Sequence, residues 1–421
     1  MHSLTIHPAR LQGVINVPTS KSLAHRAIIC AALAKGESVI TNISMSKDIE
    51  ATIGAMRALG ATIITQGTTL YINGNDTFKE DHVTINCNES GSTLRFMVPV
   101  ALRNKRQVHF TGGGKLGQRP LDVFYDIFDK QGIAYKHKEG VLDLFIEGQL
   151  TSGTFAVPGD ISSQFITGLL FVLPLLEGDS RIVVTSPLQS KAYIDLTLDM
   201  LERFGIVIDH EDQVFHIRGS QQYKAHDYEV EGDFSQAANF LVAGAIGNDV
   251  TIGNLNLDSK QGDRAAITLL EEMGAQMKET PAGIKMMPSH LQCISLDASQ
   301  CPDIIPVIAV ACALAQGTSQ IMNAKRLRIK ECDRLAATVE VLKACGVDVI
   351  ELEDAMIIRG TDLFRGARLQ TYNDHRMAMM EAIMATRSVG DLILDDASCV
   401  AKSYPNFFEH YALLGGSCDE C

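Results

Sequence analysis

Residues 22–41, SLAHRAIICAALAKGESVIT, and residues 48–64, DIEATIGAMRALGATII, contain the pattern that decides the fold. The first stretch predicts a helix from Ser22 to Ala34, followed by a turn and a strand. The second predicts a helix that starts with Asp48 as its N-cap, runs to Leu59, ends at Gly60 and leads into another strand. We therefore expect a unit of alternating helices and strands.

This unit recurs along the whole chain. A glycine closes a helical run before a short apolar stretch at Gly60, Gly132, Gly205, Gly274, Gly346 and Gly415, at intervals of 72, 73, 69, 72 and 69 residues by subtraction. Another helical run opens each unit, beginning at Ser22, Ser92, Ser163, Ser235, Asp303 and His375. Each closing glycine fits a left-handed position after a helix, where a Cβ would be strained. The period indicates a repeat architecture.

The opening helices are apolar on nearly every side, which is typical of helices buried all round. The longest apolar runs, Phe165 to Leu176 and Ile304 to Ala315, have 12 residues each by count. A bilayer span needs roughly 18–20, so both runs are expected to be core helices. With short strands around them, the sequence predicts an α/β fold: two inside-out α/β barrel domains, each built from three repeats with buried helices and outer β-strands.

The domain boundaries follow from the repeat, because the chain has no Pro- or Ser-rich linker. Its 421 residues exceed the roughly 250–300 at which one core usually divides. We expect residues 18–231 to form one domain with repeats one to three. Residues 1–17 and 232–421 should form the other, with the strand from Leu4 to Val17 pairing with the later repeats.

Composition narrows the class of ligand. The chain has 37 Lys+Arg against 50 Asp+Glu and no Trp, which favours small anionic ligands over nucleic acid.

The N-terminus lacks a signal-peptide pattern, so a cytoplasmic protein is expected. The ten cysteines are scattered and are predicted to be reduced, buried thiols. The pair Cys418 and Cys421 is expected in a frayed tail, without a metal.

Lysines and arginines gather at the predicted helix starts. A helix N-terminus exposes free N–H groups and a partial positive charge, which attract anions. Eight cations lie there: Lys21, Arg26, Arg95, Arg119, Lys330, Arg334, Arg376 and Lys402. Because they recur at equivalent places in the repeat, we expect one strongly basic pocket rather than scattered solvated side chains.

Individual motifs leave alternatives open. In Pro18-Thr-Ser-Lys-Ser-Leu-Ala-His-Arg, a hydroxyl and two cations on one turn suit a phosphate or carboxylate, but Ser22 fits an ordinary helix cap as readily. Leu327-Arg-Ile-Lys-Glu-Cys-Asp-Arg has an alternating order that usually marks a solvent face with ion pairs. Tyr372-Asn-Asp-His-Arg and Ala401-Lys-Ser-Tyr-Pro, at equivalent or adjacent places, favour a binding site instead. The glycines at 112–114 do not form a phosphate-loop motif.

Together, the order and spacing of these motifs resemble the 5-enolpyruvylshikimate-3-phosphate synthase family of the shikimate pathway, over essentially the whole chain. The resemblance implies transfer of the enolpyruvyl (carboxyvinyl) group of phosphoenolpyruvate to the 5-hydroxyl of shikimate 3-phosphate, with release of phosphate, through a tetrahedral intermediate. It implies no metal, no organic cofactor and no nucleic-acid or membrane partner, and a monomeric protein.

The resemblance also implies roles for individual residues. Shikimate 3-phosphate is expected to contact Lys21, Ser22, Arg26, Ser162, Ser163, Gln164, Ser190, Asp303 and Lys330. Phosphoenolpyruvate is expected to contact Lys21, Gly91, Arg119, Gln164, Arg334, Arg376 and Lys402. The catalytic residues are expected to be Lys21, Asp303, which accepts the proton of the 5-hydroxyl, and Glu331, which protonates the methylene carbon. These residue types suit the reaction. The lysines and arginines bind the anionic groups of both substrates, and the two carboxyl groups can move the proton that each step transfers.

Three positions depart from the family pattern. Glu89 and His25 each replace a common Asn, the second without an expected effect, and Arg326 replaces an Asn that contacts the acceptor. Gly91 is retained, which implies sensitivity to glyphosate.

Two other hypotheses remain. The related enolpyruvyl transferases that act on UDP-N-acetylglucosamine place Asn after the first Lys and a reactive Cys in the second repeat. Here Ser22 follows Lys21, and residues 111–119 hold no Cys. A non-catalytic anion-binding scaffold is the third hypothesis, but it would not need Asp303 and Glu331 beside the cations.

Overall fold

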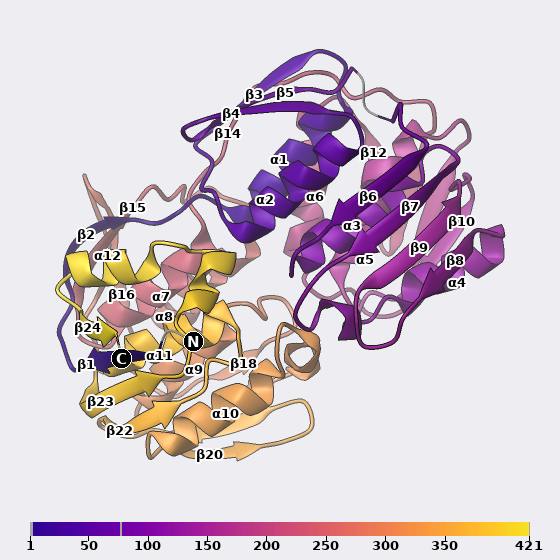
Figure 1. Ribbon diagram of the computed structural model, residues 1–421. Helices are drawn as coiled ribbons and strands as arrows, with labels where there is room; N and C mark the ends of the chain where they lie inside the picture. Colours follow the sequence, from indigo (N-terminus) through magenta and orange to yellow (C-terminus); the bar gives the residue numbers. More distant parts are fainter. Residues whose placement is uncertain (1–2, 76–77, 421) are drawn as a thin grey trace. The chain divides into compact units, whose positions relative to one another are not determined.

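The computed structural model describes residues 3–75 and 78–420 (Figure 1). The chain divides into two compact units, residues 21–230 and residues 1–20 with 231–421.

The unit of residues 21–230 contains three repeats. The first consists of α1 (Lys21–Leu33), β3 (Glu37–Thr41), α2 (Lys47–Ala58), β4 (Thr62–Gln66) and β5 (Thr69–Asn73). The second consists of β6 (His82–Asn86), α3 (Gly91–Ala101), β7 (Arg106–Thr111), the 3-10 helix η1 (Leu116–Gln118), α4 (Asp122–Gln131), β8 (Ala134–His137) and β9 (Asp143–Gly148). The third consists of β10 (Thr154–Val157), α5 (Ser163–Val172), η2 (Leu173–Leu175), β11 (Ser180–Val184), α6 (Lys191–Arg203), β12 (Ile208–Glu211) and β13 (Val214–Ile217), and β14 (Tyr228–Glu229) follows it.

The other unit starts with β1 (Leu4–His7) and β2 (Gln12–Asn16). Its fourth repeat consists of α7 (Phe234–Ala245), β15 (Asp249–Gly253), η3 (Gly262–Arg264), α8 (Ala265–Glu272), β16 (Gln276–Thr280) and β17 (Gly283–Met287). The fifth consists of β18 (Ser295–Asp297), α9 (Ile305–Ala313), β19 (Thr318–Met322), η4 (Lys325–Ile329), α10 (Arg334–Ala344), β20 (Asp348–Glu351) and β21 (Met356–Arg359). The sixth consists of β22 (Phe364–Leu369), α11 (His375–Ala385), β23 (Ser388–Leu394), η5 (Ser398–Lys402), α12 (Phe407–Leu413) and β24 (Ser417–Glu420).

All six repeats have the same four-stranded sheet. In the second repeat, β6 is parallel to β7, which pairs antiparallel with β9, and β9 pairs antiparallel with β8. Three repeats take a strand from elsewhere: β14 completes the first sheet, β2 the fourth and β1 the sixth. The N-terminal segment, which we expected as one strand, is therefore two strands, because it serves two different sheets of its unit.

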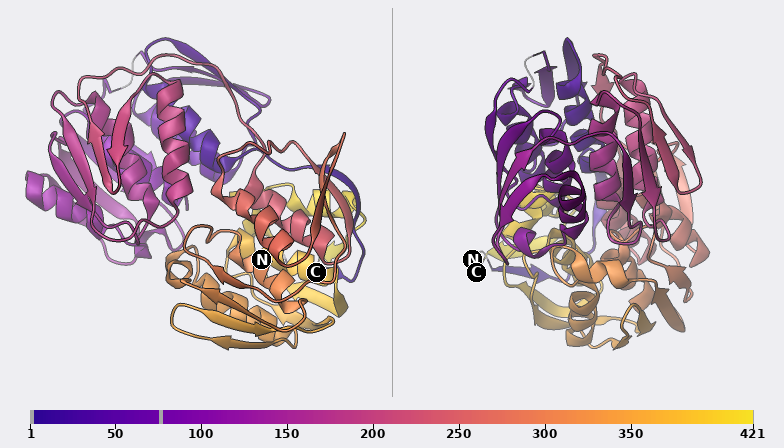
Figure 2. Two further views of the ribbon diagram at one scale, coloured as in Figure 1. Left: turned by 180° about the vertical axis from the view of Figure 1, so that it is seen from behind. Right: turned by 90° about the vertical axis from the view of Figure 1, so that its right-hand side faces the viewer.

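In each unit the opening helices lie inside and the strands outside (Figure 2). The helices α7, α9 and α11 are buried along their entire length. Each Leu, Ile or Phe that they bury contributes roughly 1.5–3 kcal/mol. The two long apolar runs form α5 with η2, and α9, and no helix in the described part of the chain is long and apolar enough to cross a membrane. The predicted inside-out α/β fold class is confirmed.

The closing glycines confirm the backbone prediction. Gly60, Gly132, Gly205, Gly274, Gly346 and Gly415 have φ values of 105°, 68°, 81°, 94°, 87° and 93°. A residue with a Cβ would be strained at each of these positions, so backbone geometry requires glycine where the second helix of each repeat ends.

Two local predictions are wrong. The N-cap of α2 is Ser46, whose extended backbone lets its hydroxyl accept a hydrogen bond from the Ile49 N–H, so Asp48 lies inside the first turn. Cys418 is not in a frayed tail, because it lies in β24, which pairs with β1; Cys421 lies outside the described residues. Seven of the nine described cysteines are buried, and all nine are free thiols.

Candidate active site

The first turns of α1 and α2 are joined in the unit of residues 21–230. Lys21 is the first residue of α1, and its Nζ lies 2.8 Å from Oδ2 of Asp48 on α2. Helix α2 therefore holds the ammonium group at the N-terminal end of α1. The sequence predicted Asp48 as the N-cap of α2, but its side chain binds the ammonium group of Lys21 instead.

The N-terminal ends of α3 and α5 are joined through Gln164. Its Oε1 accepts a 2.8 Å hydrogen bond from Nη1 of Arg95, and its Nε2 donates to the Ser92 hydroxyl at 2.9 Å. Ser162 caps α5, because its hydroxyl accepts from the Gln164 N–H at 3.3 Å. Ser163 is the buried first residue of the same helix. Gln164 is thus fixed in orientation before any ligand arrives.

Arg119 lies directly over Gly91. A Cβ added to Gly91 would be 2.4 Å from Nη1 of Arg119, so any other residue would displace the guanidinium. Glycine at the first position of α3 therefore allows a cation to approach the free N–H groups of the helix. Similarly, a Cβ on Gly114 would lie 2.5 Å from Oε2 of Glu89, so Glu89 packs against the glycine segment.

Arg26 is buried, and its guanidinium is held within its own unit. It donates to Oγ1 of Thr197 at 2.9 Å and to the carbonyl groups of Ser22 and Tyr193 at 2.7 and 2.8 Å. Burial lowers the pKa of Arg26 to about 10, so it stays charged at neutral pH. A substrate that contacts Arg26 would therefore bind a guanidinium that already makes these three hydrogen bonds.

Ser190 has a strained backbone next to this group. It precedes α6, is fully buried and has a φ of 54°, in the left-handed region that non-glycine residues rarely occupy. Such strain costs about 1–3 kcal/mol and tends to occur at functional sites.

His25 belongs to a buried chain of hydroxyl groups. Its Nδ1 lies 2.7 Å from Oγ1 of Thr52, which lies 2.7 Å from Oγ1 of Thr93, which in turn donates to the Ser90 hydroxyl at 2.8 Å. Burial and the charges of Lys21 and Arg26 hold the pKa of His25 well below its ordinary value, so the ring is neutral. The chain links α1, α2 and the cap of α3, which gives the departure at His25 a structural role.

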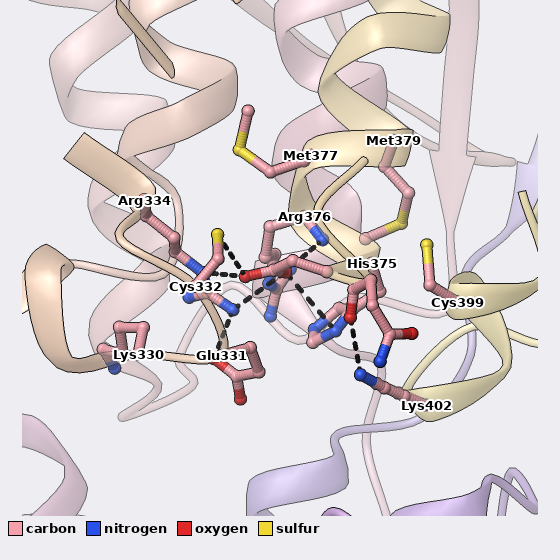
Figure 3. A network of polar contacts seen from close by, with 12 residues as sticks. Lys330, Glu331, Cys332, Arg334, His375, Arg376, Met377, Met379, Cys399 and Lys402 are labelled. Carbon is pink, nitrogen blue, oxygen red and sulfur yellow. Dashed lines mark hydrogen bonds and ion pairs between the residues drawn. The ribbon is translucent and has the colours of Figure 1, made fainter. Parts of the chain in front are cut away.

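Arg334 is the centre of the polar network in the other unit (Figure 3). It is the first residue of α10, and only 1% of its side chain is exposed. Its guanidinium contacts three carboxylates: Asp303 at 2.8 Å, Glu331 at 2.8 Å, and Asp374 at 2.7 and 3.2 Å. The alternating charges of residues 330–334 therefore do not form a solvent face.

Asp303 is held between two cations of this network. Its Oδ1 lies 2.9 Å from Nζ of Lys330 and 2.8 Å from Nη1 of Arg334. Burial raises the pKa of Asp303, but the charges of Lys330, Arg334 and Arg376 outweigh burial and hold that pKa well below its usual range. Burial also lowers the pKa of Lys330, and the nearby charge of the buried Arg326 lowers it further. Asp303 is therefore an ionised proton acceptor that the cations make weakly basic.

The remaining members, Asp374, Arg376 and Lys402, lie around the N-terminus of α11. Asp374 caps this helix through the Arg376 N–H at 2.9 Å while it also holds Arg334. Nη1 of Arg376 donates to the Ser235 carbonyl at 2.8 Å, and Nζ of Lys402 donates to the Asn373 carbonyl at 2.5 Å. The start of α11 thus holds the side chains of Arg334 and Lys402, which come from two different repeats.

The eight predicted cations divide equally between the two units, four in each. Lys21, Arg334 and Arg376 lie in the first turn of a helix, whereas Lys402 is the last residue of η5, and Arg119 and Lys330 directly follow η1 and η4. Those around residues 303–376 are balanced by carboxylates, so this cluster is a mixed network rather than a bare basic surface. The sequence analysis missed Asp374, although an Asp two residues before an Arg at a helix start is a readable cap signal. Among the described residues, no group of three or more His, Cys, Asp or Glu could hold a metal ion.

Solved structures share this architecture. An EPSP synthase from Acinetobacter baumannii matches with a TM-score of 0.82 and 25% identity over the whole of both chains. The enolpyruvyl transferase NikO from Streptomyces tendae matches in fold alone, with a TM-score of 0.81 at 17% identity over 100% of this chain and 99% of that one. Fold and site together define the class of enolpyruvyl transferases.

Sequence comparison narrows the class. The family model of EPSP synthase (3-phosphoshikimate 1-carboxyvinyltransferase) matches residues 6–411. A 3-phosphoshikimate 1-carboxyvinyltransferase of Clostridium perfringens is 49% identical over 99% of both chains, and one of Clostridium kluyveri is 46% identical over 100% of this chain and 99% of the other.

The chain belongs to the EPSP synthase family. It is accordingly a transferase of the shikimate pathway that acts on small-molecule substrates. The family and the enzyme class predicted from the sequence are confirmed.

Proposed function

We propose that this enzyme transfers the carboxyvinyl group of phosphoenolpyruvate to the 5-hydroxyl of shikimate 3-phosphate and releases phosphate. The observation that carries this proposal is the buried contact of Arg334 with both Asp303 and Glu331, because it places two carboxyl groups beside one anion-binding cation. Addition followed by elimination requires such a pair to move protons.

The ligand contacts of the proposal follow the helix starts. Phosphoenolpyruvate is bound by Lys21, Gly91, Arg119, Gln164, Arg334, Arg376 and Lys402. Shikimate 3-phosphate is bound by Lys21, Ser22, Arg26, Ser162, Ser163, Gln164, Ser190, Asp303 and Lys330. Arginine forks and free helix N–H groups suit the phosphate and carboxylate groups of both substrates.

Substrate binding itself would activate Asp303. The phosphate and carboxylate groups compete with Asp303 for Lys330 and Arg334, so its pKa rises when they bind. Asp303 then takes the proton of the 5-hydroxyl as the oxygen bonds to C2 of the enol, and Glu331 gives a proton to C3. In the elimination, the Glu331 carboxylate takes a proton back from C3, the double bond between C2 and C3 forms again, and the bond from C2 to the phosphate oxygen breaks to release phosphate. Lys21 and Arg334 stabilise the charge on the leaving phosphate.

The remaining parts of the proposal concern the whole protein. We propose that residues 18–231 and residues 1–17 with 232–421 are its two domains, in accord with two units that change over at residues 20–21 and 230–231. The protein is a cytoplasmic monomer that uses no metal or organic cofactor and binds neither nucleic acid nor membrane.

A test of the proposal compares two acceptors. Purified enzyme is given phosphoenolpyruvate with either shikimate 3-phosphate or UDP-N-acetylglucosamine, and released phosphate is measured. We expect release only with shikimate 3-phosphate. Release only with the nucleotide sugar would reassign the acceptor, and no release with either would favour an anion-binding scaffold.

A further inference from the structure

A carboxyl group that the proposed mechanism does not use, Asp263, lies buried beside Arg376. Asp263 is in η3, with 2% of its surface exposed. Its Oδ2 accepts a hydrogen bond from the hydroxyl of Ser235, in the first turn of α7. The carbonyl of the same Ser235 accepts the 2.8 Å hydrogen bond from Nη1 of Arg376. One residue therefore connects Asp263 to a proposed ligand of phosphoenolpyruvate.

The groups around Asp263 determine when it is charged. The charged or titratable groups that interact electrostatically with Asp263 include Asp303, Arg376, Asp233 and the thiol of Cys301. Burial is the main reason why the pKa of Asp263 is raised to about 6, and repulsion by Asp303 adds to the rise. The hydrogen bond from Ser235 and the charge of Arg376 oppose it. Asp263 thus changes from neutral to charged within the range in which enzymes commonly work.

The repulsion between Asp263 and Asp303 acts on both carboxyl groups. An ionised Asp263 increases the proton affinity of Asp303, and a protonated Asp263 does not. Lys330, Arg334 and Arg376 pull in the opposite direction, because they stabilise the charged form of Asp303. The three cations make Asp303 a weaker base, and the buried carboxylate of Asp263 makes it a stronger one.

We propose that Asp263 is a positioning residue for the transfer reaction: held by Ser235, its carboxylate fixes the site of Arg376 and keeps Asp303 basic enough to take the hydroxyl proton. This inference rests on the proposed function. In this proposal Asp263 acts through Asp303 and Arg376 and not on the substrate itself.

The first test uses Asp263→Asn, which keeps the shape of the side chain and removes its charge. We expect kcat at pH 7.5 to fall about tenfold, because Asp303 becomes a weaker base, with KM values changed less than about twofold. The rise of kcat through pH 6 should become shallower. Substrate phosphates also titrate near pH 6, so only the difference between variant and wild type reports on Asp263.

A second variant separates this role from a purely structural one. Ser235→Ala removes the hydroxyl that lowers the pKa of Asp263 but keeps the backbone carbonyl that holds Arg376. The rise of kcat should therefore move to higher pH, whereas a structural role predicts an equal loss at every pH. Asp258→Asn, at an exposed position five residues before Asp263, is the matched control and should leave the profile unchanged.

The outcomes distinguish the two proposals. An active wild type whose pH profile coincides with that of Asp263→Asn would overturn this inference alone. If Asp263→Asn does not fold, an unshifted profile in Ser235→Ala overturns it and an upward shift supports it. A wild type that releases no phosphate with shikimate 3-phosphate would overturn the proposed function, and this inference with it.

Discussion

Replacing Arg334 with methionine should destabilise its unit by about 3–5 kcal/mol and abolish phosphate release, because it removes one partner of a buried ionic network. Three carboxylates, those of Asp303, Glu331 and Asp374, would lose their shared cation at a position where 1% of the side chain is exposed. Urea unfolding, followed by circular dichroism, measures the change in stability. An unfolding midpoint equal to that of the wild type would contradict this prediction.

Two further variants show which part of Arg334 matters. Arg334→Lys keeps the charge but loses the planar fork, so it should recover part of the stability and little of the activity. Combining Arg334→Met with Asp374→Asn removes a cation together with a buried anion, so the double variant should be more stable than Arg334→Met alone. Its activity should stay absent, because the phosphoenolpyruvate ligand is still missing.

Replacing Glu381 with methionine should stabilise the protein, most strongly at alkaline pH. Glu381 lies in α11 with no exposed surface, and neither of its carboxyl oxygens has a hydrogen-bond partner within residues 3–75 and 78–420. Burial, with a contribution from the charge of Asp395, raises the pKa of Glu381 well above its ordinary value. Methionine has a similar volume and no polar group to bury.

The pH dependence of this gain has a definite sign. The native state holds the Glu381 proton to higher pH than the unfolded state does, so the stability present below the ordinary pKa is lost as pH rises toward the raised native pKa. The advantage of Glu381→Met should therefore grow by about 1.4 kcal/mol per pH unit above the ordinary pKa of Glu. Denaturant unfolding from pH 4 to pH 8 measures it. Glu271→Met, at an exposed position of α8, should show no such slope, and a pH-independent gain in Glu381→Met would contradict the assignment.

The periodic features of the fold could be predicted from the sequence because they depend on backbone geometry and local burial. The glycine at the end of each second helix needs a positive φ, and α9 is apolar on all sides, so both are visible in single segments. The exchange of strands was harder to predict. β1 and β14 are short, and their pairing with β23 and β3 depends on contacts far apart in the chain.

In the candidate site, the cations could be predicted and their partners could not. Lys21 and Arg334 stand at helix starts that the repeat locates. Asp48 and Asp374 hold them from other helices, and each also fits the ordinary position of a residue in the first turn or cap. Asp263 lies in the short 3-10 helix η3, which has no distinctive sequence pattern, so only its burial in the folded chain reveals it.

The most direct measurement of the proton-transfer account is turnover of phosphoenolpyruvate and shikimate 3-phosphate in D₂O, with the product analysed by mass spectrometry. If a carboxyl group such as Glu331 protonates C3, the intermediate carries a methyl group, and elimination can remove any of its three hydrogens. The account predicts deuterium in the methylene group of the product carboxyvinyl ether. Product formed at the full rate without deuterium would contradict addition and elimination at this site.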